Sequence, residues 1–184
     1  VSSAASDVYK RQNLNCNIFV RSILTVLSLH CSAIQAETRK ITLGVKPGLH
    51  FEPKVLHVLP GEEVELTFDN SDMMMHNFVL VKPGMRMGIV EAANALGAEG
   101  PKLDYVPVSE NVLASTPVVM PKKKATIRFK APLKEDQYPY VCTFPGHGFL
   151  MHGTLFVTKA EPKELTAVPQ EEAGLPVSVP EELI

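Results

Sequence analysis

The sequence predicts an all-β protein, a β-sandwich of short antiparallel strands. Between residues 39 and 159, runs rich in β-branched and aromatic residues alternate with Gly, Pro, Asn or Asp. Apolar residues fall at every second position in 64–68 and 126–130, as expected of strands with one buried face. Many short strands without helical crossovers between them favour a sandwich.

Turn-forming residues separate the expected strands. The pair Pro60-Gly61 ends one run, and Pro121-Lys122 precedes a later one. The expected strands, in order, are 41–46, 51–59, 63–70, 77–82, 112–114, 125–130, 138–143 and 153–158.

One interval departs from the strand pattern. Residues 87–96 (MGIVEAANAL) contain helix formers with apolar residues near helical spacing, and Gly97 follows directly. We expect a short helix there. It lies in an insertion from residue 83 to about residue 117, which we expect to cover one side of the sandwich as a flap.

Length, composition and charge are those of one ordinary domain. The chain has 184 residues, of which 45% are hydrophobic, enough for a single core. We place the domain at 37–159, where 14 basic and 13 acidic residues nearly balance. It has no basic stripe for nucleic acid. Residues 160–184 hold six glutamates and one lysine, which predicts an acidic flexible tail or linker.

Residues 1–36 are expected to lie outside the domain. Residues 2–12 (SSAASDVYKRQ) resemble a translated sequencing-library adapter. Residues 18–34 are apolar, carry Arg21 near their start and lead through small residues to Ala36. This pattern is typical of a secretory signal peptide cleaved near Ala36, with export to the periplasm, and a membrane anchor is the alternative.

Cleavage at that point leaves one cysteine. Cys16 and Cys31 belong to the expected leader, so Cys142 remains alone and no disulfide can form within the mature chain. A lone thiol in an oxidising compartment is either a buried structural residue or a metal ligand.

Three metal donors lie on one short segment, CTFPGHGFLM. Cys142 and His147 are separated by four residues, and His147 and Met151 by three, around a Pro-Gly pair that allows a tight turn. His76 offers a second imidazole from an upstream run. Each residue alone is commonly structural, but two histidines, one cysteine and a distant methionine suit a copper electron-transfer centre. Zinc prefers four strong ligands, and iron-sulfur clusters need more cysteines.

At these motifs the sequence resembles the cupredoxins, the type 1 blue copper proteins, and within them azurin and the auracyanin-like domains. The resemblance covers 37–159 and rests on His76-Asn77, on YPYVCTFPGH at 138–147, and on Met151 with the following GTL. It implies a Greek-key, cupredoxin-like sandwich of about eight strands with one type 1 copper ion per domain.

The resemblance also implies roles for individual residues. Cys142, His76 and His147 become the equatorial ligands of copper and Met151 the axial ligand. The remaining implied site residues are a hydrogen-bonded brace of Asn77 and Thr143, backbone N–H groups near Phe144 that reach the sulfur, and a partner-docking patch of Met74, Met75, Pro145, Gly148 and Phe149 around the exposed edge of His147.

Two features depart from azurin. Azurins have a glycine before the first ligand histidine, and the carbonyl of that glycine approaches copper as a weak fifth ligand. In this sequence the position is Met75, so whether its carbonyl makes the same weak contact stays open. Azurins also have a disulfide, which the mature chain cannot form. These departures indicate an azurin-like relative.

The resemblance implies an electron carrier and not an enzyme. Its expected partners are redox proteins such as a c-type cytochrome or a terminal reductase or oxidase, met in transient encounters by a monomer. Copper storage or delivery stays open, because thioether clusters can bind Cu(I) and five further methionines lie within about a dozen residues of His76 (Met73, Met74, Met75, Met85 and Met87). A fragment of a multi-domain copper oxidoreductase needs His-x-His pairs, a pattern that His50, His57 and His152 do not form.

Overall fold

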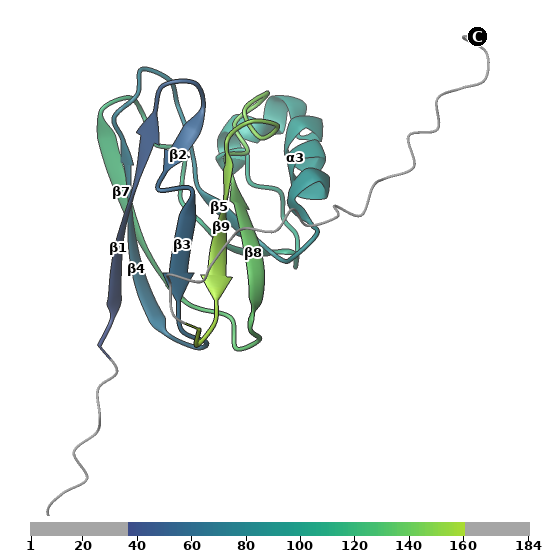
Figure 1. The fold of residues 1–184 in the computed structure, drawn as a ribbon. Helices are drawn as coiled ribbons and strands as arrows, with labels where there is room; N and C mark the ends of the chain where they lie inside the picture. The colour runs from purple at the N-terminus through teal and green to yellow at the C-terminus, as the bar shows by residue number, and fades with distance from the viewer. Residues whose placement is uncertain (1–36, 161–184) are drawn as a thin grey trace, which may run out of the picture. The chain divides into compact units, whose positions relative to one another are not determined.

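The computed structural model describes residues 37–160. In order along this part of the chain, the elements are β1 (Arg39–Lys46), β2 (His50–Glu52), β3 (Val55–Val58), β4 (Glu63–Asn70), β5 (Val79–Val81), α3 (Arg86–Ala95), η1 (Gly97–Leu103), β6 (Val112–Ser115), β7 (Lys123–Lys130), β8 (Asp136–Val141) and β9 (His152–Val157). Figure 1 shows two facing sheets, with α3 beside the sheet that contains β8 and β9. The expected leader at 1–36, and the expected tail after residue 160, lie outside the described residues. Among the described helices, none has the length and apolar character needed to cross a membrane.

The first sheet has the strand order β2-β1-β4-β7. Its long strand β4 buries Val64, Leu66, Phe68 and Asn70, every second residue, as the alternating sequence predicts. β4 pairs antiparallel with β7 but parallel with β1. It ends at Asn70, at the upper end of the sandwich in Figure 1.

The second sheet has the order β3-β9-β8-β5-β6. β9 pairs antiparallel with β8 and parallel with β3. The chain leaves β8 at Val141 and enters β9 at His152, so the connection between them also lies at the upper end.

Two strand expectations are wrong. The run 51–59 is divided: β2 belongs to the first sheet and β3 to the second, so the described residues contain nine strands. Pro53 lies at the crossing, where its missing N–H interrupts any ladder, and its carbonyl accepts a 2.8 Å hydrogen bond from the Tyr140 hydroxyl. The sandwich is also not purely antiparallel. β1 runs parallel to β4, and β3 runs parallel to β9, because the chain changes sheets between these strands.

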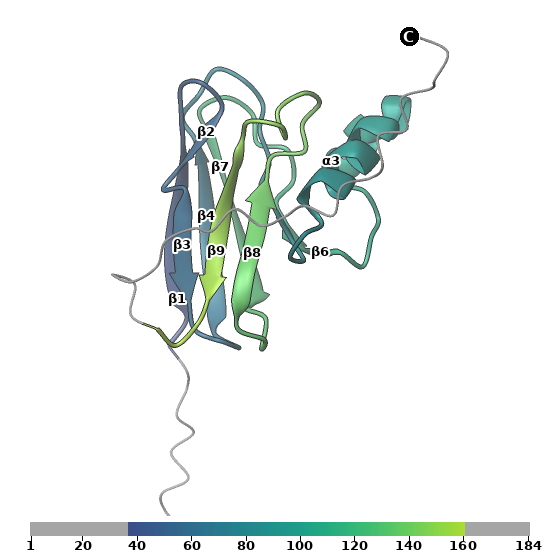
Figure 2. The same ribbon diagram turned by 45° about the vertical axis from the view of Figure 1, so that its right-hand side comes forward.

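The predicted helix and flap are present. α3 begins one residue before the predicted start and buries Ile89, Val90 and Ala93. Ile89 and Val90 pack with Val79 and Val141 of the second sheet, in a cluster separate from the main core. Figure 2 shows α3 outside this sheet, next to β8 and β6. The β-sandwich with a short inserted helix is therefore confirmed.

Aromatic rings fill the main core between the sheets. Phe51 contacts Phe68 and Tyr140 at centroid separations of 5.9 and 5.2 Å, and Phe78 contacts Tyr140 at 5.4 Å. Rings from β2, β4 and β8 meet there, and such pairs contribute beyond the area that they bury. This buried core lies beneath the loops at the upper end.

Candidate metal centre

Three donor atoms from distant parts of the chain meet at the upper end of the sandwich. Sγ of Cys142 lies 3.8 Å from Nδ1 of His76 and 3.7 Å from Nδ1 of His147. The two Nδ1 atoms are 3.2 Å apart. Met151 lies near them and is fully buried. Two imidazole nitrogens and one sulfur that converge at such distances form the arrangement that a single small metal ion requires.

A tight turn positions His147. His147 N donates to Phe144 O at 3.0 Å, and between them lie Pro145 and Gly146, the latter with φ +82°. Proline followed by a residue with positive φ is the signature of a type II turn, which favours glycine at the second position. The Phe144 ring packs between the rings of His147 and Tyr105, with both centroid separations 5.0 Å.

Backbone hydrogen bonds close the ligand loop, residues 142–151. His147 O accepts from Leu150 N at 3.0 Å and from Met151 N at 2.8 Å, and Met151 O accepts from Cys142 N at 3.0 Å. The three donor residues of this loop are thus joined by the main chain itself. Their relative positions do not depend on the rotamer of an exposed side chain.

The other histidine is held by pairing with Val119. His76 N donates to Val119 O at 3.3 Å, and Val119 N donates to His76 O at 2.7 Å. Buried Asn70 donates from Nδ2 to Met74 O at 2.7 Å and to Val119 O at 2.8 Å. β5 begins only at Val79, so His76 precedes the strand in which its run was expected to continue, and sits in an isolated β-bridge.

A buried side-chain pair connects the two ligand segments. Asn77 Oδ1 accepts from Thr143 N at 2.8 Å, and Asn77 Nδ2 donates to Thr143 Oγ1 at 2.8 Å. The same Nδ2 donates to Asp104 O at 2.9 Å, which ties the insertion to the pair. Asn77 and Thr143 are both buried. The residues of the expected brace are therefore in contact, and Asp104 is a partner that the sequence did not indicate.

Protonation of the donors follows from their burial. Burial lowers the pKa of His76 and of His147, so both rings are neutral at neutral pH and each has a nitrogen lone pair to offer a metal. Burial raises the pKa of Cys142 to about 11, although backbone N–H groups of Asn77 and Phe144 hydrogen-bond its sulfur. Metal binding must therefore displace the thiol proton. One thiolate, two neutral imidazoles and a buried thioether fit copper better than a hard cation.

Asp72 is a site residue that sequence reasoning missed. Its Oδ2 lies 3.1 Å from Nε2 of His76, the ring nitrogen opposite the one that faces Cys142. The N–H of Met73 and the His76 ring hold the pKa of Asp72 below its usual range. Aspartate four residues before a histidine carries no signal in a loop, because no helix or strand period relates the two.

Helix α3 also supports the ligand loop, a second feature that the sequence did not indicate. Arg86 Nη1 donates to Gly148 O at 2.9 Å. A Cβ atom at Gly148 would lie 2.4 Å from a methyl group of Val90 and 3.0 Å from Cys142 O. The glycine thus allows helix and loop to approach closely. The insertion is a structural support of the site as well as a cover of the sheet.

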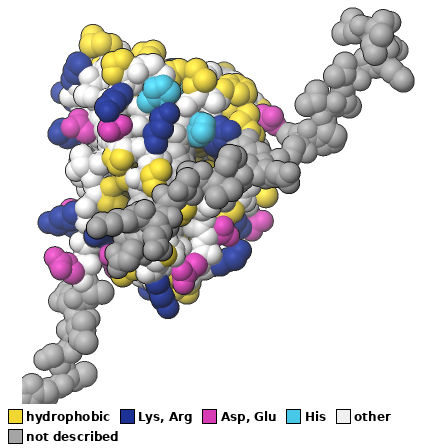
Figure 3. Space-filling view, in the orientation of Figure 1, with side chains coloured by type: hydrophobic (Ala, Val, Ile, Leu, Met, Phe, Trp, Pro, Cys, Tyr) yellow, Lys and Arg dark blue, Asp and Glu magenta, His cyan; other side chains and the backbone are white. Residues whose placement is uncertain are grey.

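The expected docking patch is only partly at the surface. Met74, Pro145 and Phe149 are exposed, and Leu150 extends the patch. Gly148 does not belong to it, because Val90 covers that position. Figure 3 shows hydrophobic side chains gathered along the upper edge of the view, while charged side chains of both signs are interspersed below.

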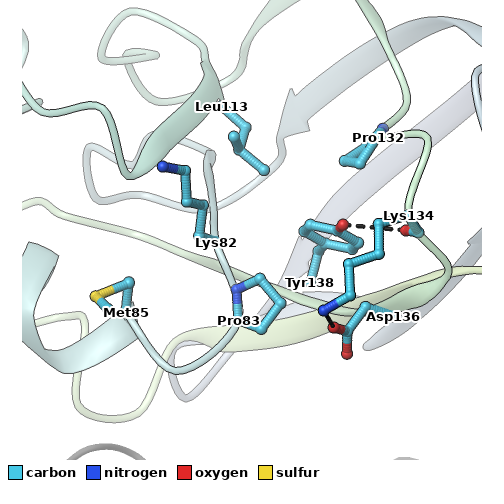
Figure 4. Close-up of a pocket in the computed structure, with 8 residues that line it drawn as sticks. All are labelled: Lys82, Pro83, Met85, Leu113, Pro132, Lys134, Asp136 and Tyr138. Carbon is cyan, nitrogen blue, oxygen red and sulfur yellow. Dashed lines mark hydrogen bonds and ion pairs between the residues drawn. The ribbon is translucent and has the colours of Figure 1, made fainter.

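A surface pocket of about 390 Å³ lies away from the centre, near the start of β8. Figure 4 shows its lining: Lys82, Pro83, Met85, Leu113, Pro132, Lys134, Asp136 and Tyr138. Lys134 pairs with Asp136 at 3.0 Å, and the Tyr138 hydroxyl donates to Lys134 O. Of the described residues that line the pocket, none is a histidine or a cysteine. The donor cluster is therefore the stronger functional candidate.

Comparisons with known proteins agree with the donor set. A sequence profile for copper binding proteins of the plastocyanin/azurin family matches residues 39–158. Auracyanin-A of Chloroflexus aurantiacus is 37% identical over 114 residues, which span 59% of this chain and 67% of that protein. Azurin of Pseudomonas aeruginosa is 38% identical over 87 residues, 46% of this chain and 57% of that protein. The matched segments thus span between about half and two thirds of these relatives.

Solved structures give the same picture. Auracyanin A of Chloroflexus aurantiacus, a "blue" copper protein, has a TM-score of 0.61 and 34% identity, and the match covers 66% of this chain and 100% of that one. Reduced auracyanin of Roseiflexus castenholzii has a TM-score of 0.58 and 29% identity, with coverages of 65% and 96%. The predicted resemblance, the fold class and copper as the metal are thereby confirmed.

Proposed function

We propose that this chain, which belongs to the plastocyanin/azurin family of copper-binding proteins, carries single electrons between redox partners. The observation that carries the proposal is the convergence of His76 Nδ1, His147 Nδ1 and Cys142 Sγ in a buried site. In the proposed site these three atoms would hold the copper ion, and the thioether of Met151 would be its fourth donor. The carbonyl of Met75 is a proposed weak fifth contact.

The residues around the donors suit electron exchange. Bound copper supplies a one-electron couple between Cu(II) and Cu(I). The closed hydrogen bonds of the ligand loop and the brace between Asn77 and Thr143 keep the donors in one arrangement. A donor set that does not move when its charge changes lowers the reorganisation that electron transfer requires. With four protein donors on the metal, we infer a carrier without an open position for substrate, and therefore no enzymatic activity.

We propose that electrons pass through the edge of His147. His147 is 9% exposed, whereas His76, Cys142 and Met151 are 0% exposed. Met74, Pro145 and Phe149 provide an exposed apolar rim for a partner. A small apolar contact suits a transient encounter with a c-type cytochrome or a terminal reductase or oxidase. The leader pattern at 18–36 supports the periplasm as the compartment, and a monomer suffices for this role.

Spectroscopy of the purified protein loaded with copper tests the proposal. We expect an intense thiolate-to-copper absorption band, narrow copper hyperfine splitting in EPR, and one tightly held ion that is reduced and reoxidised reversibly. Cys142→Ser should abolish the band, while Thr126→Ser, on the exposed face of β7, should leave it unchanged. A colourless protein that prefers zinc refutes the proposal. Several exchangeable Cu(I) ions favour storage or delivery, and turnover of nitrite or oxygen favours an oxidoreductase fragment.

A further inference from the structure

The two histidines of the site differ at their second ring nitrogen. Nε2 of His76 lies 3.1 Å from Oδ2 of Asp72. The His76 side chain is 0% exposed and that of Asp72 only 16% exposed, so this contact is largely shielded from water. His147, in contrast, carries the partly exposed edge described above.

Asp72 is held in place by its own loop. Its Oδ1 accepts from Met73 N at 2.7 Å, and its backbone N–H donates to Asn70 Oδ1 at 3.1 Å. The same Asn70 side chain anchors Met74 O and Val119 O. One carboxylate oxygen is thus engaged by the main chain, which directs the other at the His76 ring.

The chemistry of this contact assigns the ring protons. An ionised carboxylate has no hydrogen to donate, so Nε2 of His76 must carry the proton. Nδ1 then has a free lone pair, and it is Nδ1 that faces Cys142 Sγ and His147 Nδ1. A carboxylate behind a ligand histidine orients the ring and makes it a stronger donor.

We propose that Asp72 is a positioning residue that holds His76 in the Nε2–H tautomer and lowers the reduction potential of the centre. The second part rests on the proposed copper function. A copper ion held here would pass from Cu(II) to Cu(I) on receiving one electron from a partner, and the centre would lose one positive charge. The carboxylate and the stronger imidazole donor stabilise the more positively charged Cu(II) state more than Cu(I). Reduction is therefore less favourable with Asp72 than without it.

Two substitutions separate the components of this role. Asp72→Asn removes the negative charge. The asparagine side chain has only one acceptor oxygen, whereas Asp72 uses one oxygen for Met73 N and the other for His76 Nε2. Asp72→Ala removes both bonds. Asp69→Asn is the matched control, because it changes the net charge by the same amount. Asp69 is the second-last residue of β4, and its carboxylate pairs with exposed Lys124 at 2.7 Å.

The first measurement is the midpoint potential of the copper-loaded protein. We expect both Asp72 variants to bind Cu(II) about 10- to 100-fold more weakly than wild type, with a smaller loss for Cu(I). For each factor of ten by which the loss of Cu(II) affinity exceeds the loss of Cu(I) affinity, the reduction potential rises by about 59 mV. Asp69→Asn should leave the potential near that of wild type. Equal potentials for Asp72→Asn and Asp69→Asn would overturn the inference about potential.

The second measurement needs no metal. In nitrogen-15 NMR of the metal-free protein, we expect the Nε2–H proton of His76 at low field in wild type and Asp69→Asn, and shifted upfield or lost to exchange in both Asp72 variants. An unchanged signal in Asp72→Ala overturns the positioning role, provided that the variant still unfolds cooperatively. A wild-type protein that binds no copper through Cys142 refutes the proposed function instead, and the NMR result still decides the tautomer.

Discussion

Replacing Asn77 by alanine removes three hydrogen bonds from the buried link between the two ligand segments. Thr143 N and Thr143 Oγ1 lose partners at 2.8 Å, and Asp104 O loses one at 2.9 Å. Leaving a buried polar group unpaired costs about 1–3 kcal/mol. Thr143 is 1% exposed, so its N–H incurs this cost in full. Its hydroxyl can rotate and Asp104 is partly exposed, so we expect a total loss of about 2–5 kcal/mol.

The assay is equilibrium unfolding of the metal-free protein in guanidinium chloride. Domains of this size have unfolding free energies of about 5–15 kcal/mol, so Asn77→Ala should remain folded but have a clearly lower midpoint. Thr126→Ala is the control. It removes an exposed hydroxyl pair with Thr67 at 3.0 Å, and a surface change of this kind alters stability by only about 0.5 kcal/mol.

A double-mutant cycle with Thr143→Ala tests the reasoning further. Because the two side chains satisfy one another, the double variant should lose less than the sum of the single variants, with a coupling of about 0.5–3 kcal/mol. A loss below about 0.5 kcal/mol for Asn77→Ala, or strict additivity in the cycle, would refute the brace as a structural link.

Four further outcomes are expected. Gly148→Ala should cost about 1–3 kcal/mol of unfolding free energy by overpacking, because its Cβ would lie 2.4 Å from Val90, and Val90→Ala should relieve part of that loss in the same denaturation assay. The metal-free protein should lose stability as pH falls below the ordinary histidine pKa of 6.5, because burial lowers the pKa of His76 and His147 and the unfolded chain binds protons first. It should also lose stability as pH rises from 9.0 towards about 11, because burial raises the pKa of Cys142 and the unfolded thiol ionises first; urea midpoints across pH check both limbs. Stopped-flow association with a redox partner should depend only weakly on salt, because 14 basic residues nearly balance 13 acidic ones between residues 37 and 159, and a steep fall in rate would contradict this.

Parts of the fold were readable from the sequence because they depend on local pattern. Alternation in 64–68 predicted the buried face of β4, and the helical segment at 87–96 was placed within one residue at each end. The division of 51–59 was not readable, because both halves have strand composition and only the packing of two sheets decides where the chain crosses. The parallel pairs escaped prediction for the same reason, since strand neighbours are chosen by tertiary packing.

For the site, the sequence by itself determined the chemistry of the donors. Cys142, His147 and Met151 lie on one loop, and spacing along a loop is a local property that a Pro-Gly turn converts directly into geometry. The tertiary structure decided what surrounds them. Asp72 behind His76 and α3 against Gly148 depend on contacts between segments with no regular relation in sequence. Such contacts arise only when the sheets and the insertion are packed together, and they set how firmly the donors are held.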